Sequence, residues 1–149
     1  MLNVTKRINI VSIKLVKESS FLYQTLTISS PKDAYEMIKD QLQDLDREQF
    51  IIACLNTKNE PTNISVVSVG SLNKAIVHPR EVFKTAILSN AASVMAFHNH
   101  PSGETTPSQQ DIQLTNRLYE VGELLGIKLL DHLIIGDRTF TSLKEKGYL

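Results

Sequence analysis

The sequence predicts an α/β or α+β fold in which a single mixed β-sheet is flanked by about three helices. Short segments rich in apolar and β-branched residues alternate along the chain with longer segments whose apolar residues recur at helical spacing. Gly, Pro and charged residues separate these segments. At 149 residues, with 42% hydrophobic and 21% charged side chains, the chain can enclose one core. We therefore expect a single domain over residues 1–149.

The first expected strands are residues 8–17 and 22–29, where apolar and β-branched side chains gather. No residue typical of catalysis stands out there, so residues 1–30 should extend the sheet or serve as a packing or homodimer element. A helix should follow, with Ser30 as its N-cap and Pro31 in the first position, and should continue to about Leu45. Its apolar stripe consists of Ala34, Ile38, Leu42 and Leu45.

The middle of the chain should form a hairpin at the centre of the sheet. The charged residues 46–48 end the first helix, and an apolar strand is predicted at 49–56. A turn leads to its hairpin partner at 63–69, and the loop 70–73 leads to a short extended piece at 75–77.

Two further helices enclose another buried strand. The second helix should cover residues 79–89, and a strand is predicted at 94–97. The third helix should cover residues 108–125 and end at Gly126, which suits the left-handed position after a helix. The residues that we expect these helices to turn inward are Val82, Phe83, Ala86 and Ile87 in the second, and Leu114, Leu118, Val121 and Leu125 in the third.

The C-terminal segment should complete the sheet. Residues 127–130 and 132–135 form a predicted strand that is bent or interrupted near Asp131. Residues 136–138 make a turn, and a last short strand is predicted at 139–142.

Composition excludes several classes of protein. Lys plus Arg equals Asp plus Glu at 16 each, and this zero net charge, without an obvious basic stripe, argues against nucleic acid as a partner. The single cysteine, Cys54, excludes an internal disulfide or a Cys-rich zinc site and is expected to be buried. No segment approaches the ~20 apolar residues of a membrane span, and no signal peptide is evident, so we expect a cytoplasmic protein.

The stretch VMAFHNHPSGETTPSQQD, residues 94–111, carries the residues best suited to chemistry. His98 and His100 lie at i and i+2, so on a strand both imidazoles would project from the same face. Pro101 stops the strand, a loop follows, and Ser108 and Asp111 open the next helix. Two imidazole nitrogens, one carboxylate oxygen and a vacant fourth position are what a catalytic zinc ion requires.

This pattern resembles the signature of the JAMM (JAB/MPN-type) metalloproteases, in which His-x-His-Pro is followed at fixed spacing by Ser-x-x-Asp. The longer motifs HNHPSG and PSxxD are similar to those of the RadC-like branch, and this similarity extends over about residues 46–143. The resemblance implies an MPN/JAB (cytidine-deaminase-like) architecture and a Zn2+ ion held by His98, His100 and Asp111. It also implies a hydrolase of amide bonds in peptides or isopeptide-linked proteins, with Ser108 stabilising the tetrahedral intermediate.

The family pattern also requires an upstream glutamate as general base, and two residues are candidates. Glu48 lies between the first helix and the first central strand, which matches the family's order of elements, and we favour it. Glu81 lies in the first turn of the second helix, where the helix dipole alone accounts for an acidic residue.

Several of these residues also have purely structural readings. Ser108 and Asp111 match a capping box, which is compatible with metal binding. Asp131 and His132 fit a buried polar pair better than a group that orients a metal ligand. Asn99 and Ser102, beside the ligands, are candidates for substrate contact.

Three other functions compete with a metallopeptidase. The fold could be a nucleic-acid-associated module with a structural metal, against which the zero net charge counts. It could be a protein-interaction scaffold, as MPN-type domains without the motif are, against which the complete motif counts. A zinc nucleobase deaminase needs a Pro-Cys-x-x-Cys motif that a single cysteine cannot supply.

Overall fold

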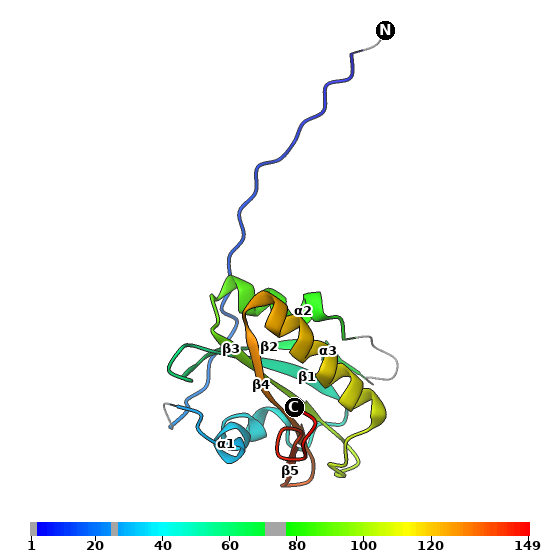
Figure 1. Ribbon diagram of the computed structural model, residues 1–149. Coiled ribbons are helices and arrows are strands. Elements are labelled where there is room, and N and C mark those ends of the chain that lie inside the picture. Colours follow the sequence, from blue (N-terminus) through cyan, green and yellow to red (C-terminus); the bar gives the residue numbers. More distant parts are fainter. Residues whose placement is uncertain (1–2, 25–26, 71–76) are drawn as a thin grey trace.

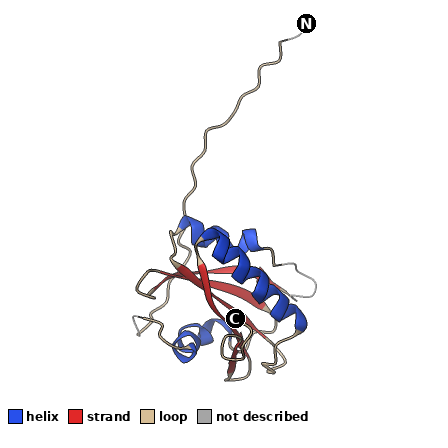
Figure 2. Cartoon of the chain, in the orientation of Figure 1, coloured by secondary structure: helices blue, strands red, loops and turns tan. Residues whose placement is uncertain are grey.

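A computed structural model describes residues 3–24, 27–70 and 77–149, and its centre is a five-stranded sheet with helices on both faces (Figures 1 and 2). The strands follow in the order β2-β1-β3-β4-β5. Their bounds are Gln49–Leu55 for β1, Pro61–Val69 for β2, Ser93–Asn99 for β3, Lys128–Ile135 for β4 and Phe140–Ser142 for β5. Among the described strands, only the β3–β4 pair is parallel. The predicted mixed sheet and fold class are confirmed.

The three predicted helices are present as α1 (Pro31–Leu42), α2 (Pro79–Leu88) and α3 (Gln109–Leu125). The α1 helix begins as expected, because the Ser30 side chain accepts a hydrogen bond from the Asp33 N–H. It ends at Leu42 rather than near Leu45, because the chain leaves the helical conformation at Gln43.

The core lies on both sides of the sheet. On one side α1 packs through Ala34, Ile38 and Leu42, and on the other side α2 and α3 pack through apolar residues that include Phe83 and Leu118. Figure 1 shows the same layers, with α1 on one face and α2 and α3 together on the other. The β1 strand is buried on both faces, because its side chains alternate between the two clusters.

Two residues expected to face inward do not. Ile87 is 53% exposed and Leu125 is 45% exposed, so these predictions are wrong. The fully enclosed face of α3 consists instead of Asp111, Thr115, Leu118 and Gly122. Gly122 is required where the helix lies close to the start of β4, because a Cβ atom there would collide with the Ile127 carbonyl oxygen. The prediction is confirmed for Leu118, and Leu114 and Val121 are half-buried against the core, so apolar spacing misplaced only Leu125 on this helix.

The predicted N-terminal strands are also wrong. Described residues 3–24 and 27–30 contain no strand, and the segment from residue 3 to about residue 20 extends away from the domain as an arm (Figure 1). Its apolar side chains are largely exposed, as at Ile8 and Ile10. β-branched residues favour extended backbone, but a strand also needs a hydrogen-bonding partner, which the described chain does not give this segment. The loop predicted at 70–73 and the extended piece at 75–77 fall mainly on residues 71–76, outside the described residues.

The β4 strand is continuous, although a bend or interruption was expected near Asp131. β4 runs from Lys128 to Ile135, and the predicted irregularity is a register shift in which Leu129 pairs with Val94 and Asp131 pairs with Met95. Within the described ranges, no helix combines the length and apolar character that a membrane crossing requires.

The β3–α3–β4 connection brings the candidate residues together. Because β3 and β4 are parallel and α3 joins them, the carboxyl end of β3 lies beside the amino end of α3. This is the end of a parallel strand at which α/β folds commonly bind ligands.

Candidate metal centre

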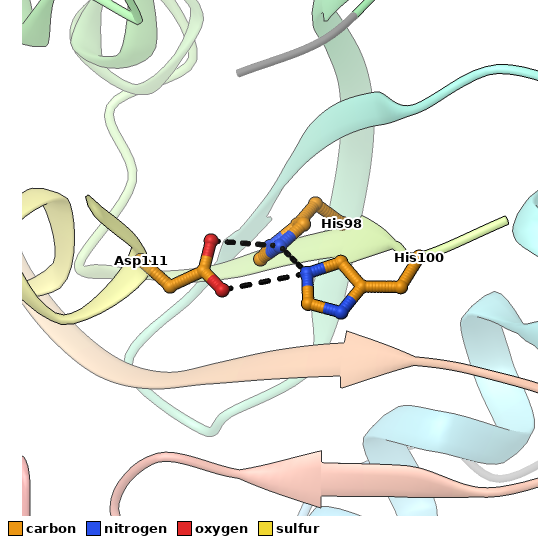
Figure 3. A group of neighbouring side chains, drawn as sticks. All are labelled: His98, His100 and Asp111. Atoms are coloured by element: carbon orange, nitrogen blue, oxygen red, sulfur yellow. Dashed lines mark hydrogen bonds and ion pairs between the residues drawn. The ribbon is translucent and has the colours of Figure 1, made fainter. Parts of the chain in front are cut away.

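His98, His100 and Asp111 come together at the end of β3 (Figure 3). His98 lies in β3, and His100 follows directly after its last residue, Asn99. Both imidazoles nevertheless project to the same place, as the i, i+2 spacing predicted. Asp111 reaches them from the first turn of α3.

The donor atoms of these three residues face one another. The Nε2 atoms of His98 and His100 are 2.9 Å apart. Asp111 Oδ1 lies 3.1 Å from His98 Nε2, and Asp111 Oδ2 lies 3.4 Å from His100 Nε2. The side chains of His98 and Asp111 are 0% and 2% exposed, whereas that of His100 is 16% exposed. Access from solvent is therefore through the His100 side.

A buried chain of hydrogen bonds sets the proton positions on His98. The Thr115 hydroxyl donates to the Asp111 carbonyl oxygen over 2.7 Å, so it can only accept from His132 Nδ1, also at 2.7 Å. His132 Nε2 is then an acceptor, and His98 Nδ1, 2.8 Å away, must donate to it. The Nε2 atom of His98 consequently keeps its lone pair for the shared centre.

His100 reaches the same state by a different route. Its Nδ1 lies 2.8 Å from the Glu104 carbonyl oxygen, which can only accept a hydrogen bond. The proton of the neutral imidazole is therefore on Nδ1, and the lone pair on Nε2 points toward His98 and Asp111. Gly103, in the loop after His100, has a φ of +88°, a conformation that glycine adopts readily.

The carboxylate of Asp111 serves both as helix cap and as part of this centre. Ser108 and Asp111 form the complete predicted capping box: the Asp111 N–H donates to Ser108 Oγ, and the Ser108 N–H donates to Asp111 Oδ2 over 2.7 Å. Burial by itself would raise the pKa of the Asp111 carboxyl, but in the metal-free site hydrogen bonds from the protonated forms of His100 and His98 outweigh burial and hold that pKa well below its ordinary range. Asp111 is therefore an anion at neutral pH.

The two candidate glutamates lie in different surroundings. A hydrogen bond to Asp111 raises the pKa of His100 above its ordinary value, against the effect of partial burial, and the negative charge of Glu48 adds to the increase. Glu48 thus lies within electrostatic range of the centre. Glu81 is exposed, and its carboxylate is 2.8 Å from the Lys84 ammonium. These surroundings favour Glu48 over Glu81.

The donor set fits a metal ion. Two neutral nitrogen lone pairs 2.9 Å apart would repel each other unless a proton or a cation lies between them, and a buried carboxylate adds the negative charge that a cation requires. In the described part of the chain, the group able to hold a metal ion contains these three residues, with donor atoms within 4.8 Å of one another. Three protein ligands leave one position open, as in catalytic rather than structural zinc sites.

The Ser108 hydroxyl keeps a free proton. Among the described residues, its only hydrogen bond is the one that it accepts from the Asp111 N–H. An O–H group that accepts at its oxygen can still donate, so Ser108 offers a donor beside Asp111.

Part of this arrangement was not predicted from the sequence. The Asp131 carboxylate accepts a hydrogen bond from the His132 backbone N–H over 2.7 Å, but the His132 imidazole bonds to His98 and Thr115. The less favoured interpretation of His132, a group that orients a metal ligand, is therefore the one that the structure supports. Thr115 was not recognised, although it lies four residues after Asp111 and thus on the same helix face. Asp131 instead accepts hydrogen bonds from the Ser142 hydroxyl and the Lys144 N–H.

Comparison with known proteins identifies the family. The profile of the RadC-like JAB domain matches residues 28–148, a longer stretch than the expected core of 46–143. The UPF0758 protein YsxA of Bacillus subtilis is 52% identical over 136 residues, covering 91% of this chain and 57% of that protein. A UPF0758 protein of Moorella thermoacetica is 52% identical over 131 residues, covering 88% of this chain and 57% of that protein. The chain thus spans little more than half the length of these curated relatives. It belongs to the RadC-like JAB domain family.

Proposed function

We propose that this protein is a zinc-dependent hydrolase of amide bonds, of the metallopeptidase or isopeptidase type. One observation carries the proposal: the Nε2 atoms of His98 and His100 and the Asp111 carboxylate converge while the remaining ring nitrogens are already hydrogen-bonded. Such a set is prepared to hold a cation and leaves a coordination position for a reactant.

Zinc is the metal that suits these donors best. Imidazole nitrogen and carboxylate oxygen are typical zinc ligands, and His100 opens the site to solvent on one side. When bound, zinc supplies a Lewis acid that lowers the pKa of a coordinated water to about 7 and polarises a carbonyl group.

The protein's own residues would handle the protons. Glu48 would take a proton from water and pass it to the leaving amine, so that the elements of water are added across the C–N bond without a covalent enzyme intermediate. Ser108 would donate a hydrogen bond from its hydroxyl to the oxyanion. Removing such a donor in other enzymes raises the activation free energy by about 3–4 kcal/mol. The substrate would be a peptide or an isopeptide-linked protein.

Metal content tests the proposal first. Elemental analysis would compare the wild-type protein with the Asp111→Ala and Glu48→Gln variants after reconstitution with Zn2+ at neutral pH. We expect near-stoichiometric zinc in the wild type and in Glu48→Gln, and loss of zinc in Asp111→Ala. Glu81→Gln is the matched control, because it neutralises the other candidate glutamate, which is exposed and paired with Lys84.

Hydrolysis would be tested next, with a fluorogenic peptide and isopeptide library. Cleavage by the wild type and by Glu81→Gln, but not by Glu48→Gln, would support the proposed base. A wild-type protein that binds no zinc would refute the proposal. The scaffold function would then lead, and a salt-sensitive affinity for DNA would instead favour the nucleic-acid-associated module.

A further inference from the structure

Asn99, the residue between the two histidine ligands, turns away from them and is 3% exposed. Its carboxamide oxygen accepts a hydrogen bond from the Gln49 N–H over 2.7 Å. Its carboxamide nitrogen donates to the Arg47 carbonyl oxygen over 2.9 Å. Both polar groups of the side chain are therefore used on backbone, which speaks against the expected contact with substrate.

These two backbone groups flank Glu48. The Arg47 carbonyl belongs to the peptide unit before Glu48, and the Gln49 N–H belongs to the peptide unit after it. The Glu48 carbonyl oxygen is also held, because it accepts a hydrogen bond from the Gly70 N–H over 2.7 Å. The backbone of the candidate base is thus held by the Asn99 side chain and by the Gly70 N–H, directly after β2.

The Asn99 side chain replaces the strand-to-strand hydrogen bonds beyond the end of the β1–β3 pairing. In the antiparallel pairing of β1 with β3, the last matched residues are Phe50 and His98. Beyond this pair no strand ladder ties the segment before β1 to β3, and the Asn99 carboxamide supplies one acceptor and one donor in its place. Aspartate could not replace it fully, since an ionised carboxylate has no N–H to donate.

We infer that Asn99 is a positioning residue that holds Glu48 at a set distance from the metal ligands His98 and His100. Residues 98–100 then carry both histidine ligands and the Asn99 side chain. We call the two hydrogen bonds of that side chain, to the Gln49 N–H and the Arg47 carbonyl oxygen, the Asn99 clamp. Because the clamp and the ligands share this short piece of backbone, they move together. This inference rests on the proposed function for its chemical consequence, while the clamp itself can be tested without metal.

The first test is amide hydrogen exchange in the metal-free protein. Asn99→Ala should increase exchange at Gln49 and Gly70 by about tenfold, because the clamp is lost, and should leave the central β1 amides unchanged. Asn99→Asp keeps the acceptor for Gln49 and should give an intermediate effect. It also keeps the test valid if Asn99→Ala folds poorly.

The matched control is Asn56→Ala. Asn56 makes the same kind of clamp in the turn after β1, where its side-chain oxygen accepts from the Lys58 and Glu60 N–H groups. It lies at the opposite end of a seven-residue strand, roughly 26 Å along the chain from Glu48. This variant should loosen its own turn without changing exchange at Gln49.

The second test uses Co2+ as the probe metal. The visible spectrum of the Co2+-loaded protein would be titrated with pH, since a nearby carboxylate affects the ionisation of water at the metal. Glu48→Gln should shift the titration midpoint. Asn99→Ala should shift the midpoint in the same direction by at least half as much, with Co2+ affinity within about twofold of wild type. The double variant Asn99→Ala/Glu48→Gln should have the same midpoint as Glu48→Gln alone.

The outcomes separate the inference from the proposed function. Unchanged exchange at Gln49 in Asn99→Ala, or a wild-type midpoint in Asn99→Ala where Glu48→Gln moves it, would overturn the role of Asn99. Independent, additive shifts in the double variant would overturn it too. Failure to bind Co2+ or Zn2+ would refute the proposed function, and the hydrogen exchange would still decide whether Asn99 holds the Glu48 backbone.

Discussion

The buried hydrogen-bond chain behind His98 leads to a specific prediction for Thr115→Val. Valine is close to threonine in shape but lacks the hydroxyl, which makes two hydrogen bonds of 2.7 Å in the wild type. Without that acceptor, His132 can move its proton from Nδ1 to Nε2 and donate to His98. The proton of His98 would then sit on Nε2, where the metal must bind.

The size of the effect follows from the same contacts. Changing an outer hydrogen-bond partner of a metal ligand typically lowers metal affinity by about 10–100-fold. Because the imidazole of His132 remains in place, we expect the lower end, about tenfold or 1.4 kcal/mol. The lost hydrogen bonds of a fully buried hydroxyl should also lower the free energy of unfolding by about 1–3 kcal/mol.

Chelator competition with Zn2+ and urea unfolding would measure the two effects separately. Thr115→Ser keeps the hydroxyl and should recover most of the zinc affinity. Leu118→Ala is the matched control, since Leu118 lies on the same buried face of α3 but has no polar atom. It should destabilise the fold by about 2–5 kcal/mol with little change in zinc affinity. Zinc affinity within twofold of wild type in Thr115→Val would refute the reasoning.

Four further predictions concern the same site. Asp111→Asn preserves a helix-capping side chain but removes the charge, so zinc affinity should fall by more than the roughly 100-fold seen for outer-partner changes, whereas the helix content by circular dichroism should not change. Because zinc needs neutral His100, whose pKa lies above the ordinary 6.5, apparent zinc affinity should fall about tenfold per pH unit once the pH drops below that raised pKa; an affinity flat between pH 8 and 6 would contradict this. Burial holds the pKa of His132 well below 6.5, so below that pH the unfolded chain takes up a proton that the folded chain does not. The metal-free protein should therefore lose about 1.4 kcal/mol of stability per pH unit as the pH falls from 6.5, and urea unfolding of His132→Gln should lack this component. Gly136→Ala would place a Cβ against the backbone of the loop that follows His100, so we expect a loss of about 1–3 kcal/mol in urea unfolding, and a wild-type stability would show that this loop yields freely.

Short-range features were predictable from the sequence. The ends of α1, α2 and α3 were placed within three residues, because caps such as Ser30 and Gly126 act on backbone groups close to them in the chain. The capping box of Ser108 with Asp111 and the shared direction of the two histidines follow from spacing alone.

Features that depend on long-range contacts were predicted poorly. The exposed arm before α1 has the composition of a strand, but pairing requires a partner that composition does not reveal. Ile87 and Leu125 were placed inward because apolar spacing reports a helix face only approximately. The true inner face of α3 was decided by how closely that helix approaches the sheet at Gly122.

By itself, the sequence predicted that His98, His100 and Asp111 form a group that could hold a metal ion, and the structure brings these three residues together. They lie within fourteen positions of one another in the chain. Only the tertiary structure decided what surrounds them. The contact of His132 with His98, the nearness of Glu48 to His100 and the Asn99 clamp each join residues separated by 34 to 52 positions. Such contacts are set by the register of β1, β3 and β4, which local propensity does not encode.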